Sequence, residues 1–68
     1  MLVEEVRERV NHVVEAYAGR NPEALEKARI LIYRRVLRAI AAGECPDPAG
    51  CAAEAMRLDE VDRPFCDH

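Results

Sequence analysis

The stretch PEALEKARILIYRRVLRAIAAG, residues 22–43, decides the fold of this chain. Its apolar residues recur three and four positions apart, which is the period of an α-helix. Asn21 is a good N-cap, Pro22 suits the first helical position, and Gly43 can end the helix in the left-handed conformation. The stretch therefore predicts a helix over residues 22–42.

The apolar positions of this helix cover more than one narrow stripe. One face is marked by Leu25, Ala28, Ile32, Val36, Ala39 and Ile40. The face is widened by Ile30, Leu31, Tyr33, Leu37 and Ala41. A helix this apolar needs neighbours on two sides. The second neighbour must come from residues after Gly43 or from another subunit.

Two further helices are predicted on either side. Residues 2–18 carry a seven-residue apolar repeat, which is typical of a helix that packs on a partner. The repeat consists of Val3, Val6, Val10, Val13 and Tyr17. Asp47 followed by Pro48 repeats the cap-then-proline signal and predicts a third helix over residues 48–59, with a face formed by Cys51, Ala52, Ala55, Met56 and Leu58.

We predict a single all-α domain over residues 1–68: an antiparallel hairpin of two long helices, with the short third helix and C-terminal tail packed across one end. The chain has no tryptophan and one phenylalanine, so its core is thin for a domain of this size. We therefore expect a homodimer, such as a four-helix bundle of two hairpins. The residues expected at the subunit or partner surface are Val10, Val14, Ile30 and Leu37.

The charges are unevenly distributed along the chain. Residues 22–43 contain five bases and two acids, whereas the residues from Glu44 onward contain seven acids and two arginines. Lys27, Arg34, Arg35 and Arg38 could contact phosphates in a small nucleic-acid-binding regulator. The third helix offers almost no base-reading side chains, so we instead expect this basic face to be solvated and paired with the acidic end.

All three cysteines lie in the last 24 residues together with a histidine. One interpretation is a structural zinc site formed by Cys45, Cys51, Cys66 and His68, three sulfurs and one nitrogen. The paired-cysteine spacing of zinc modules is missing, however. The favoured alternative is buried core thiols, because Cys51 shares a helical stripe with Ala55 and Leu58. A disulfide from Cys45 to Cys51 or Cys66 is the third alternative, and the zinc or redox alternative would make the protein a responsive switch.

The composition argues against an enzyme. The chain contains no serine, no threonine and no glycine-rich loop, so the usual hydroxyl nucleophiles and phosphate-binding loops are missing. No export signal or membrane-spanning stretch is apparent, and we expect a cytoplasmic protein with reduced cysteines. His12 is expected at the surface, between Glu8 and Glu15.

The function expected from these features is a non-enzymatic helical module that binds another protein, without a cofactor.

Overall fold

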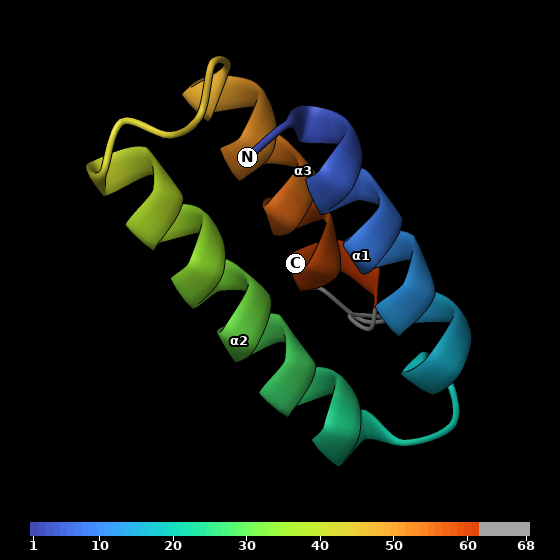
Figure 1. Cartoon of the computed structure of the whole chain (residues 1–68). Helices are drawn as coiled ribbons and strands as arrows, with labels where there is room; N and C mark the ends of the chain where they lie inside the picture. The colour runs from blue at the N-terminus through green and yellow to red at the C-terminus, as the bar shows by residue number, and fades with distance from the viewer. Residues whose placement is uncertain (62–68) are drawn as a thin grey trace.

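The computed structural model describes residues 1–61, and these form three helices and no strand (Figure 1). The helices are α1 (Val3–Tyr17), α2 (Pro22–Ala41) and α3 (Pro48–Val61). The all-α prediction is therefore confirmed for this part of the chain. The first two helices agree with the predicted ranges to within one residue at each end, and α3 continues two residues beyond the predicted end.

Local capping explains where the second and third helices begin. The Asn21 side chain accepts a hydrogen bond from the backbone N–H of Ala24 at 3.1 Å. The Asp47 side chain accepts one from the backbone N–H of Gly50 at 3.1 Å. Each bond satisfies one of the amides that an α-helix leaves unpaired in its first turn. Both caps were predicted from the sequence, and both are confirmed.

The end of α2 has a distinct glycine-dependent geometry. Gly43 adopts a φ of 73°, and two backbone bonds run back across it to the last turn of the helix. The N–H of Gly43 donates to the carbonyl of Ile40 at 3.1 Å, and that of Glu44 donates to Ala39 at 2.8 Å. This pair of bonds is the Schellman motif, in which a residue in the left-handed conformation reverses the chain.

All three pairs of helices are in contact, and the core lies where they meet. The buried apolar residues come from every helix and from the α2–α3 connector, and they are Val6, Val10, Val13, Leu25, Ile32, Val36, Ala39, Cys45, Cys51, Ala55 and Leu58. No polar or charged residue among those described is buried. The core is built almost entirely from valine, alanine, leucine and cysteine, as the aromatic-poor composition implied.

The third helix lies along the other two, and the expectation that it packs across one end is wrong. Its contacts with α1 advance in step along both helices, from Arg7 with Glu54 to Asn11 with Arg57. On its other side, Asp59 near the end of α3 pairs with Arg29 of α2 at 2.8 Å. The stripe of Cys51, Ala55 and Leu58 is buried along its whole length because it contacts both neighbours.

The start of α1 and the end of α2 lie together at one end of the bundle. The amino group of Met1, which precedes α1, donates to the carbonyl of Glu44, which follows α2, at 2.5 Å. The start of α1 therefore lies beside the end of α2. None of the helices in residues 1–61 is long and apolar enough to cross a membrane.

Candidate protein-binding surfaces

Cys45 and Cys51 belong to the core. Both are free thiols, with side chains 9% and 0% exposed respectively, and the Cys51 thiol contacts the carbonyl of Met1 at 3.7 Å. Burial raises the pKa of the Cys51 thiol, and a hydrogen bond with the Cys45 thiol raises it further. Since the thiolate is the reactive form, both effects make Cys51 a poor nucleophile at neutral pH.

Cys66 and His68, the other two residues of the predicted zinc site, lie outside the described residues. Within residues 1–61, no three potential metal ligands come together. The four-ligand zinc site therefore stays a prediction. The two cysteines that are described occupy the places predicted by the core-thiol alternative, and neither is in a disulfide.

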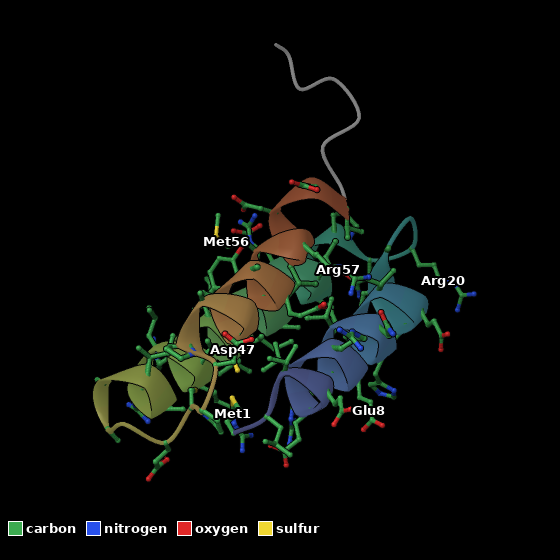
Figure 2. The ribbon with its side chains drawn as sticks, turned by 90° about the horizontal axis from the view of Figure 1, so that it is seen from above. Met1, Glu8, Arg20, Asp47, Met56 and Arg57 are labelled. Carbon is green, nitrogen blue, oxygen red and sulfur yellow. The ribbon has the colours of Figure 1, made fainter. Side chains whose placement is uncertain are left out.

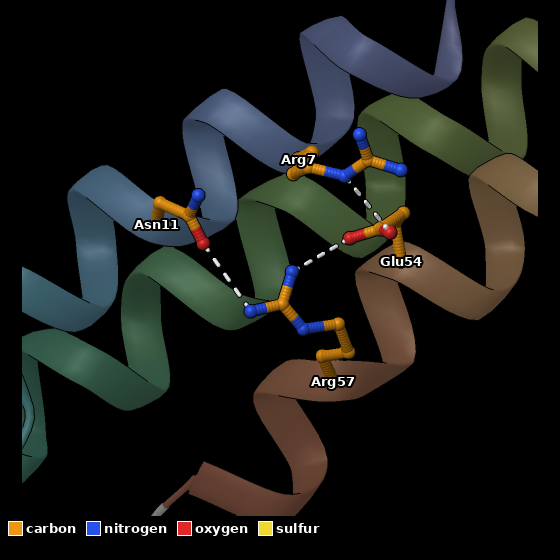
Figure 3. A network of polar contacts seen from close by, with 4 residues as sticks. All are labelled: Arg7, Asn11, Glu54 and Arg57. Atoms are coloured by element: carbon orange, nitrogen blue, oxygen red, sulfur yellow. Dashed lines mark hydrogen bonds and ion pairs between the residues drawn. The ribbon is translucent and has the colours of Figure 1, made fainter.

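A polar network outside the core attaches α3 to α1 (Figure 3). Glu54 accepts a hydrogen bond from Arg57 at 2.7 Å and one from Arg7 at 3.2 Å, while Arg57 also donates to Asn11 at 3.2 Å. The hydrogen bond from Arg57, followed by the one from Arg7, lowers the pKa of the Glu54 carboxyl. Each charge of the network thus has a partner of opposite charge within the chain.

A shallow groove runs between α1 and α2, with a volume of about 770 Å³. Its floor consists of core residues, which are Val6, Val13, Ile32 and Val36. None of these four side chains is more than 9% exposed, so a partner in the groove would bury little additional apolar surface there. The rim is formed by charged residues and His12 on α1, and by Leu31 and Arg35 on α2.

A second apolar surface lies on α2, outside the core. Four residues spaced three, four and three apart make a continuous line, which we call the α2 ridge: Ile30, Tyr33, Leu37 and Ile40. Residues with this spacing share one face of a helix. Tyr33 and Ile40 are partly buried against the core, while Ile30 is 47% and Leu37 is 63% exposed. The ridge therefore packs against the core along the edge formed by Tyr33 and Ile40, and it is exposed to solvent along the edge formed by Ile30 and Leu37.

The sequence-predicted partner residues divide into two groups in the structure. Val10 has no exposed surface and Val14 is partly buried against the core, so both are used inside one chain. Ile30 and Leu37 are exposed, as a partner surface requires. The reason is that Val10 falls on the α1 stripe that faces both other helices, whereas Ile30 and Leu37 face away from the core stripe of α2.

One exposed apolar residue was placed wrongly by the sequence pattern. Met56 was predicted on the packing face of α3, but it is 59% exposed. Figure 2 shows Met56 and Arg57 projecting from different sides of α3, with Arg57 on the side of α1. Cys51, Ala55 and Leu58 are spaced four and three residues apart, and position 56 does not fit this spacing. The sequence therefore already indicated that Met56 lies off the packing face.

The four predicted phosphate-contacting cations do not share one face. Lys27, Arg34 and Arg38 are spaced seven and four residues apart and share one side of α2, where Lys27 and Arg34 border the exposed edge of the α2 ridge. Arg35 instead lines the groove between α1 and α2. Within residues 1–61 none of these four cations forms an ion pair with a carboxylate. The expected pairing of this basic face with the acidic end is therefore not seen within residues 1–61; the contact between the two parts of the chain is made by Arg29, which was not in the predicted set and pairs with Asp59.

Comparison with known proteins does not add a family to this description: no family model, no curated protein and no solved structure matches the chain.

Proposed function

We propose that this protein is a small, non-enzymatic, cytoplasmic module that binds another protein through the α2 ridge. One observation carries the proposal. Ile30 and Leu37 lie seven residues apart on one line of α2, and both remain exposed although their neighbours Tyr33 and Ile40 are packed against the core. An aligned pair of exposed aliphatic side chains on a rigid helix is the arrangement that a helix-in-groove or helix-pairing interaction uses.

Burial of these two side chains would contribute a measurable part of the affinity for a partner. Complete burial of a leucine or isoleucine side chain stabilises by about 1.5–3 kcal/mol. About half of each side chain is exposed at Ile30 and Leu37, so a partner that covers both gains about 2–3 kcal/mol from these two residues. This corresponds to a factor of about 30–150 in affinity at 1.4 kcal/mol per tenfold.

The ridge is a better candidate than the α1–α2 groove. The apolar residues of the groove floor are already within the core, so a ligand there would mainly contact its charged rim. The groove does provide a useful comparison residue. Leu31 lies on its rim and is 57% exposed, close to the value for Leu37, on the same helix but on a different face.

A selection experiment tests the proposal. The protein is immobilised and used to select from a phage-displayed library of 18-residue amphipathic helices. We expect enriched peptides whose affinity falls about tenfold with Leu37→Ala, because the substitution removes about 1–2 kcal/mol of apolar contact. With Leu31→Ala, the matched control, the affinity should change less than twofold. Enrichment no better than on a blank surface, or equal losses from the two substitutions, would contradict the proposal.

The homodimer predicted from the sequence is a second possibility for the same surface. Sedimentation at micromolar concentration gives the mass directly, and Leu37→Ala shows whether the ridge is the subunit interface. Retention on random duplex DNA at low salt tests the nucleic-acid alternative, for which the cation set is reduced to three because Arg35 lies on the groove side. Metal content per chain, measured on protein produced with zinc, tests the zinc-responsive switch.

A further inference from the structure

We propose that the partner seated on the α2 ridge is an acidic amphipathic helix. This inference rests on the proposed function and names the chemistry of its ligand. The first observation is the position of two cations. Lys27 lies three residues before Ile30, and Arg34 lies four residues after Ile30 and three before Leu37, so both border the exposed side of the ridge. Both side chains are exposed. A helix that packs on Ile30 and Leu37 therefore passes within reach of both charges.

The second observation is that these charges are not neutralised by the rest of the described chain. The other arginines with defined partners are used internally: Arg29 by Glu26 and Asp59, and both Arg7 and Arg57 by Glu54. Lys27, Arg34 and Arg38 form no ion pair within residues 1–61. The border of the ridge consequently presents net positive charge to whatever covers it.

The nearest acids of α2 do not cancel this field. Glu26 is paired with Arg29. Glu23, in the first turn of the helix, lies four residues before Lys27 and offsets part of that charge, but it lies three turns before Arg34. Arg34 therefore keeps its charge beside Ile30 and Leu37, and Lys27 adds to it before Ile30. Carboxylates placed along the ridge gain attraction from both cations, which favours one orientation of the bound helix as well as raising its affinity.

The same charges argue against a second copy of this chain on the ridge. A two-fold interface places the same patch of both subunits face to face. Lys27 and Arg34 of one subunit would then lie near the same two cations of the other, and like charges across an interface disfavour association. An acidic helix meets the cations with opposite charge and covers the same apolar residues.

The apolar residues argue against nucleic acid. Ile30 and Leu37 lie alongside the cations, where a phosphate backbone would contact hydrocarbon and gain nothing from it. A partner that matches the ridge needs two features. It needs aliphatic side chains at i and i+7, about 10 Å apart along a helix, and it needs Asp or Glu along one flank. An acidic amphipathic helix is the protein element with that pattern.

Two synthetic 18-residue peptides test the inference. Both have the same leucine stripe, and the flank carries glutamates in one and lysines in the other. Binding is followed by fluorescence anisotropy of a labelled peptide. We expect the glutamate peptide to bind at least tenfold more tightly than the lysine peptide at 50 mM salt, and the difference to shrink at 500 mM as exposed charges are screened.

Charge reversal in the protein provides the matched comparison. Arg34→Glu should lower the affinity for the glutamate peptide about tenfold and raise the affinity for the lysine peptide, because it reverses a charge that borders the ridge. Arg35→Glu, one residue away on the groove side, should change either affinity less than threefold. Circular dichroism of both variants verifies that they remain folded. Leu37→Ala should lower the affinity for both peptides, and Leu31→Ala is its control.

The outcomes separate the inference from the proposed function. Equal binding of the two peptides, each weakened by Leu37→Ala, would overturn the acidic partner and retain the ridge. No binding of either peptide would overturn both. A dimer that dissociates with Leu37→Ala would assign the ridge to a second copy. If the protein binds random duplex DNA more tightly than the glutamate peptide, and if Arg34→Glu abolishes the DNA binding, the cations would be assigned to nucleic acid.

Discussion

Replacing Leu58 by alanine should remove much of the stability of this domain. Leu58 is among the largest fully buried side chains and is 2% exposed, near the end of the helix that contacts both others. Leucine-to-alanine changes in a core cost about 2–5 kcal/mol, because the lost transfer free energy is added to that of the cavity left behind. At about 0.05–0.15 kcal/mol per residue, 68 residues have a total stability of about 3–10 kcal/mol. The substitution therefore removes a large share of it.

Urea unfolding followed by circular dichroism at 222 nm measures the effect. With a slope of about 1 kcal/mol per molar urea, typical of a small domain, the midpoint should fall by about 2 M or more. Met56→Ala is the matched control, since Met56 lies two residues away on α3 but is 59% exposed. Its cost should stay below about 1 kcal/mol. If Leu58→Ala is unfolded without urea, Leu58→Val should still fold, at a cost of about 1 kcal/mol for one methylene.

One result would refute the reasoning. If Leu58→Ala and Met56→Ala have the same midpoint, α3 does not pack along α1 and α2 in solution as described here. The stripe Cys51, Ala55 and Leu58 would then not belong to a common core.

Three further predictions concern a turn, an ion network and a thiol. Gly43→Ala should destabilise the protein by about 1–2 kcal/mol in urea unfolding, because φ is 73° there although a Cβ would meet no other atom within 4 Å; an unchanged midpoint would contradict the Schellman geometry. Glu54 has a folded-state pKa below its unfolded one, so its stabilisation is present above the unfolded value, about pH 4.3, and is lost as pH falls through the folded value. The melting temperature of Glu54→Gln should accordingly lie below that of the unsubstituted protein at pH 7 and approach it at pH 3, and a gap independent of pH would be inconsistent with the network. Iodoacetamide followed by peptide mass spectrometry should modify Cys51 far more slowly in the native protein than in 6 M guanidinium, since its thiol is buried and its pKa is raised; equal rates would show that the thiol is accessible.

Most of the secondary structure followed from local signals. Asn21 and Asp47 cap the second and third helices as predicted, and Gly43 ends α2 in the left-handed conformation. These signals involve residues close in sequence, and their geometry depends little on the rest of the fold. The same holds for the core stripes of α1 and α2, where the repeat of Val6, Val10 and Val13 identified buried positions correctly.

The candidate site was predicted only in part. Ile30 and Leu37 were identified as surface residues, but Val10 was grouped with them although it is buried. The pattern along α1 shows that Val10 faces a neighbour, yet it cannot show whether that neighbour is in the same chain. The spacing of Ile30, Tyr33, Leu37 and Ile40 was present in the sequence and could have defined the ridge without the structure.

The sequence by itself determined the three helices, their caps and ends, and which side of each is apolar, because these depend on helix periodicity and on contacts among residues a few positions apart. Only the tertiary structure decided that α3 lies along α1 and α2, that it covers one apolar side of α2 while Ile30 and Leu37 stay in solvent, and that Arg35 lines the groove between α1 and α2. The physical reason is that several packings can bury the same stripes. The choice among them depends on side-chain shapes and ion pairs, such as Arg7 with Glu54 and Arg29 with Asp59, between residues 47 and 30 positions apart.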